Sequence, residues 1–223
     1  MKRGKFGSDQ YFHIYNRGVE KRTIFNTDDD RYRFMLLLIL MQADVPCPQI
    51  GRLLPSVKHQ MFDNEIFPQI INKRSVELIS FCLMPNHYHL IIRELAENGI
   101  SKFMQRLSDS YTKYFNIKYD RSGHLFGSKF QAINIDRNEY LNYLSAYIHL
   151  NPRELKDYYH KEVRYKWSSF QDFVFENRWG AFLNPSIILD QFDDGNEYKI
   201  FVGETPIKEI ASEVESQYLI DSS

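Results

Sequence analysis

The stretch Leu78 to Arg93, LISFCLMPNHYHLIIR, contains two apolar runs around a short histidine motif. The first run has the length of a buried strand. Pro85 predicts that this strand ends there, because proline cannot donate to a sheet ladder. The second run begins inside the motif. Side chains alternate along a strand, so we expect His87 and His89 to project from the same face of the sheet.

Two imidazoles that project side by side from a rigid strand can act as a pair of metal ligands. The same His-x-His pattern also fits a pair of surface or hydrogen-bonded histidines with no metal. The pattern is short, and taken alone it leaves both interpretations open.

Apolar periodicity and turn signals predict the other elements. We expect strands at 11–15, 75–83, 88–94 and 129–135, and helices at 29–42, 100–119 and 137–149. Residues 44–75 contain four prolines and predict a long connection with one short helix. The order is the split β-α-β-β-α-β arrangement. It predicts an α+β, ferredoxin-like (RRM-like) antiparallel sheet with helices on one face, to which the last helix is an addition.

The added helix carries Tyr143, Tyr147 and Asn151 at steps of four, which places them on one helix face. An asparagine oxygen can join two histidines as a metal ligand, and a phenolate can attack phosphorus once a metal has polarised the phosphate. The alternative is a purely structural role, in which the tyrosines form a stripe packed on the sheet. Tyr111 and Tyr114 are rival nucleophiles, although they fall in the apolar series of the 100–119 helix.

Charge is unevenly distributed along the chain. Residues 171–223 carry 3 basic and 11 acidic residues, a net charge of −8, so residues 1–170 carry +7 within the total of −1. This distribution is compatible with a polyanionic partner. The chain has only two cysteines, which favours a reducing cytoplasm, and it has no apolar run long enough for a transmembrane helix.

Basic residues favour a nucleic-acid surface, although ordinary solvated charges explain many of them equally well. Arg17 follows the first strand and could lie beside a phosphate. Between residues 102 and 137, basic side chains are interleaved with Phe126 and Phe130, as on a surface for single-stranded DNA. The candidate DNA contacts are Arg17, Arg106, Lys113 and Lys129.

Several motifs together resemble one family. Leu83-Met84-Pro85-Asn86-His87-Tyr88-His89 resembles the HUH motif of single-strand tyrosine transposases, and Tyr147-Ile148-His149-Leu150-Asn151-Pro152 looks like their tyrosine helix. Further agreement comes from Tyr15-Asn16-Arg17-Gly18, Gly123-His124-Leu125-Phe126 and Trp167-Ser168-Ser169. The closest resemblance is to the REP-associated tyrosine transposases. It spans residues 8–172, the predicted transposase domain, and leaves 173–223 as an acidic C-terminal extension.

The resemblance implies a metal-dependent nuclease and strand transferase that acts on single-stranded DNA with a hairpin. It implies His87, His89 and Asn151 as ligands of Mg²⁺ or Mn²⁺, and Tyr147 as the nucleophile that forms a 5′-phosphotyrosine. Many relatives have glutamine where this chain has Asn151, and an arginine where it has Lys129. Relatives work as homodimers that exchange tyrosines or, in the REP-associated branch, as monomers.

Two other functions compete with a transposase. The first is a nucleic-acid-binding regulator on the same fold that has lost catalysis. The second is a metal-dependent hydrolase of small phosphoesters, for which histidine-rich sites often use zinc. Retention of all four candidate site residues favours the transposase over the regulator, and the basic aromatic surface argues against the small-molecule hydrolase.

Overall fold

The structure is a computed structural model, and it describes residues 9–46 and 49–206. Its sheet consists of β1 (Tyr11–Arg17), β2 (Val76–Met84), β3 (His87–Glu94) and β4 (Gln131–Ile135). The strands lie in the order β2-β3-β1-β4, and every neighbouring pair is antiparallel. This confirms the predicted antiparallel sheet of the split β-α-β-β-α-β arrangement.

Helices surround the sheet on both faces. They are α1 (Asp28–Leu40), α2 (Leu54–His59), α3 (Ile66–Lys73), α4 (Gly99–Lys118), α5 (Asn138–Leu150), α6 (Phe170–Val174), α7 (Ser186–Leu189) and α8 (Gly195–Glu204). Short 3-10 helices connect them: η1 (Val19–Lys21), η2 (Ile50–Leu53), η3 (Asn151–Glu154), η4 (Lys156–Tyr158), η5 (Glu162–Arg164) and η6 (Gly180–Phe182).

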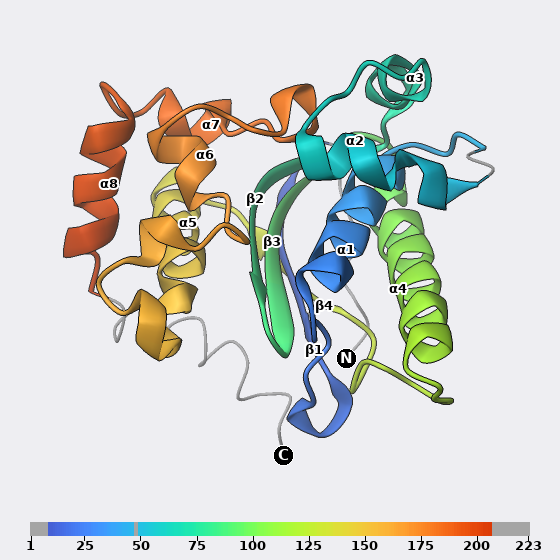
Figure 1. The fold of residues 1–223 in the computed structure, drawn as a ribbon. Helices are drawn as coiled ribbons and strands as arrows, with labels where there is room; N and C mark the ends of the chain where they lie inside the picture. Colours follow the sequence, from blue (N-terminus) through green and yellow to red (C-terminus); the bar gives the residue numbers. More distant parts are fainter. Residues whose placement is uncertain (1–8, 47–48, 207–223) are drawn as a thin grey trace.

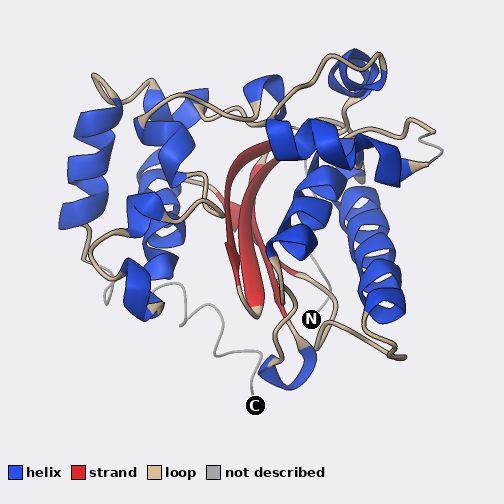
Figure 2. Cartoon of the chain, in the orientation of Figure 1, coloured by secondary structure: helices blue, strands red, loops and turns tan. Residues whose placement is uncertain are grey.

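The sheet separates two helical layers. Figure 1 shows α1 and α4 on one side of the sheet and α5 on the other, with α8 beyond α5. Figure 2 shows that nearly all loops lie at the ends and edges of this sandwich. The two core helices therefore share one face, as the sequence predicts, and the added helix covers the opposite face. None of the helices described has the length and apolar character required to span a bilayer.

The start of α1 is fixed by polar contacts. Thr27 and Asp30 form a capping box, in which each side chain accepts a hydrogen bond from the other residue's backbone. The buried Asp30 carboxylate also accepts hydrogen bonds from Tyr114, Lys118 and Tyr119 of the α4 segment. These contacts join α1 to α4 at the end of the layer, and the apolar remainder of α1 is buried behind them.

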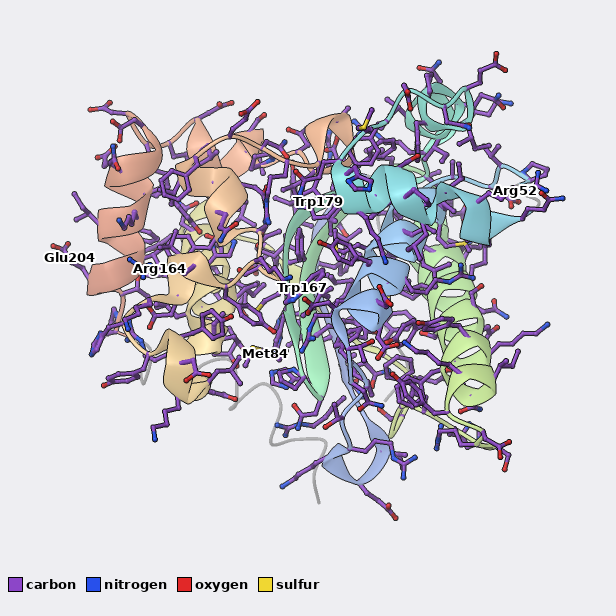
Figure 3. The ribbon with its side chains drawn as sticks, viewed as in Figure 1. Arg52, Met84, Arg164, Trp167, Trp179 and Glu204 are labelled. Carbon is purple, nitrogen blue, oxygen red and sulfur yellow. The ribbon has the colours of Figure 1, made fainter. Side chains whose placement is uncertain are left out.

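The outer edge of β2 is covered by a short segment near Trp167. The Leu83 amide donates to the Trp167 carbonyl, and the Ser169 amide donates to the Phe81 carbonyl. Trp167 also packs against Tyr32 of α1, with ring centroids 4.8 Å apart, and Figure 3 shows it between β2 and that helix. The pairing protects an edge strand that would otherwise expose its backbone groups.

The connection before β2 differs from the one that the sequence predicts. The connection 44–75 holds two helices, α2 and α3, and not one. Arg137 occupies the N-cap position of α5 without a side-chain hydrogen bond. Cys82 is a buried free thiol, whereas Cys47 lies outside the described residues.

The predicted boundary at residue 172 remains a prediction. Beyond it, α7 and α8 are folded, and Trp179, Phe182 and Tyr198 are buried. Residues 207–223 of the predicted acidic extension, and residue 8 at the start of the predicted domain, lie outside the described residues.

Candidate active site

The register of β1 and β3 brings the histidine pair and a cation together. His87 lies opposite Arg17, and His89 lies opposite Tyr15. Residues directly opposed in an antiparallel pair project from the same face. These four side chains therefore share the face that α5 covers. Tyr88 projects from the other face, where its ring lies 5.1 Å from that of Phe34 in α1.

His87 lies between two amide oxygens. Its Nδ1 is 2.6 Å from Oδ1 of Asn86, and its Nε2 is 3.2 Å from Oδ1 of Asn151. Each amide is oriented by its own nitrogen. Asn86 donates to the Lys21 carbonyl at 3.2 Å, and Asn151 donates to the Tyr147 carbonyl at 2.9 Å. Both amides consequently present acceptor atoms to the same imidazole.

Both histidines of the pair are neutral at neutral pH. Burial lowers the pKa of His87 to about 4, against a smaller opposing effect of Asn151, and the charge of Arg17 lowers it further. Burial also lowers the pKa of His89 well below its usual value, with contributions from His13, His87 and Arg17. Neutral imidazoles have a lone pair on one nitrogen, which is the form that binds a metal.

A divalent cation fits this arrangement. A neutral His87 has one N–H, so it can donate to only one of its two amide oxygens. The shorter contact, to Asn86, is the natural hydrogen bond. The Nε2 lone pair then faces the Asn151 oxygen, and a cation shared by both atoms would remove the conflict. Adjacent ligands of an octahedral ion at ~2.1 Å lie ~3.0 Å apart, close to the observed 3.2 Å separation.

The residues that could hold such an ion are the three predicted from the sequence. His87, His89 and Asn151 are all largely buried. Within the described part of the chain, no group of three or more His, Cys, Asp or Glu side chains could hold a metal. The candidate centre differs from such groups because its third donor is an amide oxygen.

Tyr147 lies beside this centre. Its ring centroid is 5.7 Å from that of His89, with the planes nearly perpendicular, and its side chain is half-buried. Asn151 lies at the end of α5 with helical backbone angles, so the one-turn spacing of Tyr147 and Asn151 is kept. The third member of the stripe, Tyr143, packs against Phe201 of α8.

The rival tyrosines lie on the other side of the sheet. The Tyr111 hydroxyl donates to the Ile24 carbonyl at 2.6 Å, and burial raises its pKa well above the usual value. The Tyr114 hydroxyl donates to Asp30 at 3.0 Å. The structure therefore brings Tyr147, and neither Tyr111 nor Tyr114, to the histidine pair.

The predicted DNA contacts occupy different surroundings. Arg17 is exposed at the end of β1, beside the histidine pair. Lys129 is exposed and lines a cleft of about 840 Å³ between α4 and the segment 124–130, and Lys113 is exposed on α4 near the cleft residue Thr112. Arg106 instead donates to the Ala43 carbonyl and lies 3.4 Å from the Asp44 carboxylate.

The sequence interpretation missed one residue at the centre. His13 of β1 is fully buried, and its Nε2 lies 2.9 Å from Nδ1 of His89. Alternation along YFHIY places His13 on the same face as Tyr15 and could have signalled this. The pairing register that brings it to His89 cannot be read from one strand alone.

Comparison with known proteins finds a family match over part of the chain. Residues 55–151 match the family described as "Transposase IS200 like", and this range includes both histidines, Tyr147 and Asn151. A search of curated proteins finds no match. The family match agrees with the resemblance that the sequence motifs suggest, and it covers residues 55–151 of the 223-residue chain.

A solved structure is similar to this chain in its fold. The chain is similar to a protein described as the REP-associated tyrosine transposase bound to a REP hairpin, with 13% sequence identity and a TM-score of 0.52. The match covers 82% of this chain and 88% of the other. The two proteins therefore share a fold over most of their lengths.

Proposed function

We propose that this protein is a metal-dependent endonuclease and strand transferase that acts on single-stranded DNA at hairpin-forming repeats. The observation that carries the proposal is the position of Tyr147. Its ring lies against that of His89, and Asn151, one helical turn later, contacts His87. The match to a transposase family supports DNA as the substrate. The hairpin in the similar solved structure supports a hairpin as the recognised form.

In this proposal, His87, His89 and Asn151 hold Mg²⁺ or Mn²⁺, and Tyr147 is the nucleophile. The ion, when bound, supplies polarisation of a phosphate oxygen. The Tyr147 oxygen attacks phosphorus, a new bond forms between them, and the bond from phosphorus to the 3′ oxygen breaks. The phenol proton leaves to solvent, and the departing oxygen takes up a proton to become a 3′-OH. A second 3′-OH reverses the step and releases Tyr147.

Arg17 has a distinct place in the mechanism. It lies directly opposite His87 in the sheet, and its charge acts on both histidines. A guanidinium at this position can bind a phosphate of the strand and hold it near Tyr147. The exposed Lys113 and Lys129 would extend this contact along the cleft beside α4.

All residues of the proposed site come from one chain. Tyr147 reaches the histidines of its own sheet, so no second subunit is needed to complete the site. This supports action as a monomer. A homodimer with exchanged tyrosines would require α5 to leave the sheet on which it packs.

The test is covalent trapping of DNA. Wild-type protein incubated with Mn²⁺ and end-labelled single-stranded hairpin DNA from the flanks of its own gene should form an adduct that survives denaturing electrophoresis. Tyr147→Phe removes the nucleophilic oxygen and keeps the ring, so it should bind Mn²⁺ and DNA without forming the adduct. Tyr111→Phe and Tyr114→Phe are the matched controls and should retain it.

Other outcomes point to other functions. An adduct that persists in Tyr147→Phe and disappears in Tyr111→Phe would move the nucleophile to α4. Wild-type protein that binds the hairpin tightly but forms no adduct with Mn²⁺ or Mg²⁺ would support the regulator that has lost catalysis.

A further inference from the structure

A third histidine contacts the candidate metal centre through one of its ligands. His13 lies on β1 opposite Ile91 of β3 and reaches diagonally to His89. The two rings are stacked, with centroids 5.1 Å apart and planes inclined by 19°, and the Nε2 of His13 is 2.9 Å from the Nδ1 of His89. Neither the family match nor the proposed mechanism gives His13 a task.

A hydrogen bond between two neutral imidazoles contains one proton, which is carried by the donor ring. Both rings are buried, and burial disfavours a charged imidazole, so each ring carries a single N–H. One ring therefore donates and the other accepts. If His89 accepts, its proton lies on Nε2, and neither of its nitrogens can bind an ion. If His89 donates from Nδ1, its Nε2 keeps a lone pair for the site.

His87 shows which arrangement the site requires. Its Nδ1 faces the oxygen of Asn86, whose orientation is fixed by the hydrogen bond to Lys21. This leaves the Nε2 of His87 directed to Asn151. The two histidines then become equivalent if each donates from Nδ1 to a protein acceptor and binds through Nε2. Metal-binding histidines in proteins are commonly oriented in this way by a second group.

We propose that His13 is a positioning residue, which accepts the Nδ1–H of His89 and so holds the Nε2 lone pair of His89 ready for a divalent ion. The inference rests on the proposed function, because it assumes that His89 is a ligand. It assigns to β1 a direct part in building the centre, in addition to its place in the middle of the sheet.

Two substitutions distinguish the effect of the hydrogen-bond acceptor of His13 from the effect of the volume of its ring. His13→Leu fills a similar volume without an acceptor, whereas the side-chain oxygen of His13→Gln can reach the position of Nε2. Tyr111→Phe is a control for loss of stability, because it removes a buried hydroxyl that donates to the Ile24 carbonyl on the other side of the sheet. Mn²⁺ affinity is measured by the EPR signal of the unbound ion, with circular dichroism as the check on folding.

We expect His13→Leu to weaken Mn²⁺ binding by roughly tenfold to a hundredfold, the range known for groups that orient metal ligands. His13→Gln should recover most of that loss, and Tyr111→Phe should bind Mn²⁺ as the wild type does. Ring-nitrogen chemical shifts, recorded by NMR on metal-free wild-type protein, should show His89 protonated on Nδ1. Wild-type affinity in folded His13→Leu, or a His89 protonated on Nε2, would overturn the proposal.

The design distinguishes this inference from the proposed function. The NMR measurement needs neither metal nor DNA, so it decides the tautomer even if His13→Leu does not fold. An adduct that persists in Tyr147→Phe would overturn the proposed nucleophile and leave the His13 result unchanged. A protein that forms the adduct normally but has the opposite His89 tautomer would overturn only the role of His13.

Discussion

At the scale of single residues, Asn151 performs two tasks with one amide group. Its nitrogen donates to the Tyr147 carbonyl one turn earlier, and its oxygen faces Nε2 of His87. The first contact fixes the rotation of the amide, and the rotation determines that oxygen, not nitrogen, faces the site. The shorter side chain of asparagine is therefore compatible with a ligand position, because the end of α5 brings Asn151 close to β3.

Substitution of Asn151 should change metal affinity in both directions. Asn151→Ala removes the oxygen donor and should weaken Mn²⁺ binding by about tenfold or more, equivalent to at least about 1.4 kcal/mol. Asn151→Asp replaces a neutral donor with a carboxylate, which attracts a divalent ion more strongly, so it should tighten binding. Calorimetric titration with Mn²⁺ measures both. Equal affinities in the wild type and Asn151→Ala would remove Asn151 from the ligand set.

The pair His87 and His89 could be predicted from the sequence because the period of a strand places them on one face. The one-turn spacing of Tyr147 and Asn151 was similarly local. His13 could not be predicted to contact His89, 76 residues away, because that contact depends on the register between two strands. The orientation of the Asn86 and Asn151 amides is set by backbone carbonyls and leaves no sequence pattern.

At the scale of elements, the position of α5 depends on a buried polar network. The Nδ1 of His149 lies 2.7 Å from the Tyr198 hydroxyl of α8, and its Nε2 lies 2.8 Å from the Ser169 hydroxyl. Ser80 of β2 also approaches His149 at 3.2 Å. His149 thus links α5 to the sheet, to the segment that covers β2, and to α8. Because Tyr147 and Asn151 lie on the same helix, this network also sets their distance from β3.

Loss of the Tyr198 hydroxyl should loosen this connection. Tyr198→Phe leaves the buried His149 and Ser145 without a partner they have in the native protein, so the free energy of unfolding should fall by about 1–3 kcal/mol. Urea denaturation monitored by circular dichroism measures the change. Tyr143→Phe is the matched control on α5, because its hydroxyl has no hydrogen bond within the described residues. A loss of similar size in both variants would contradict the role of the network.

The order of strands and main helices was accessible from the sequence because each of these elements has a clear apolar period or turn signal. The helices α2 and α3 were not, because prolines and mixed polarity obscure their short patterns. The segment after residue 172 looked polar and acidic as a whole. Its buried residues, such as Trp179, Phe182 and Tyr198, are too widely spaced to show a period, and they are buried by contacts with distant elements.

At the scale of the whole molecule, the basic side chains of residues 1–170 are not all available to contact DNA. Some cations are engaged within the protein. Lys118 lies 2.6 Å from the buried Asp30, and Arg106 is held by Ala43 and Asp44. Others, such as Arg17 and Lys129, are exposed near the candidate site or the cleft. Net charge alone therefore overstates the surface that is available to DNA.

Salt dependence of DNA binding can separate these two groups of cations. Each phosphate contact with a single strand contributes about 0.7 to the slope of log affinity against log salt concentration, because bound counterions are released. Lys129→Ala should weaken binding and reduce the slope by about 0.7. Arg106 was also predicted from the sequence as a contact. Its guanidinium already has protein partners, so we expect Arg106→Ala to change the slope less.

The measurement is fluorescence anisotropy with a labelled single-stranded hairpin at several salt concentrations, with thermal unfolding to verify that each variant is folded. If Arg106→Ala reduces the slope as much as Lys129→Ala, then Arg106 exchanges its contact with Asp44 for a phosphate, and the DNA extends along α4 toward the loop after α1. If neither variant changes the slope, the strand does not follow the cleft. An affinity that is independent of salt in the wild type would instead favour the small phosphoester substrate.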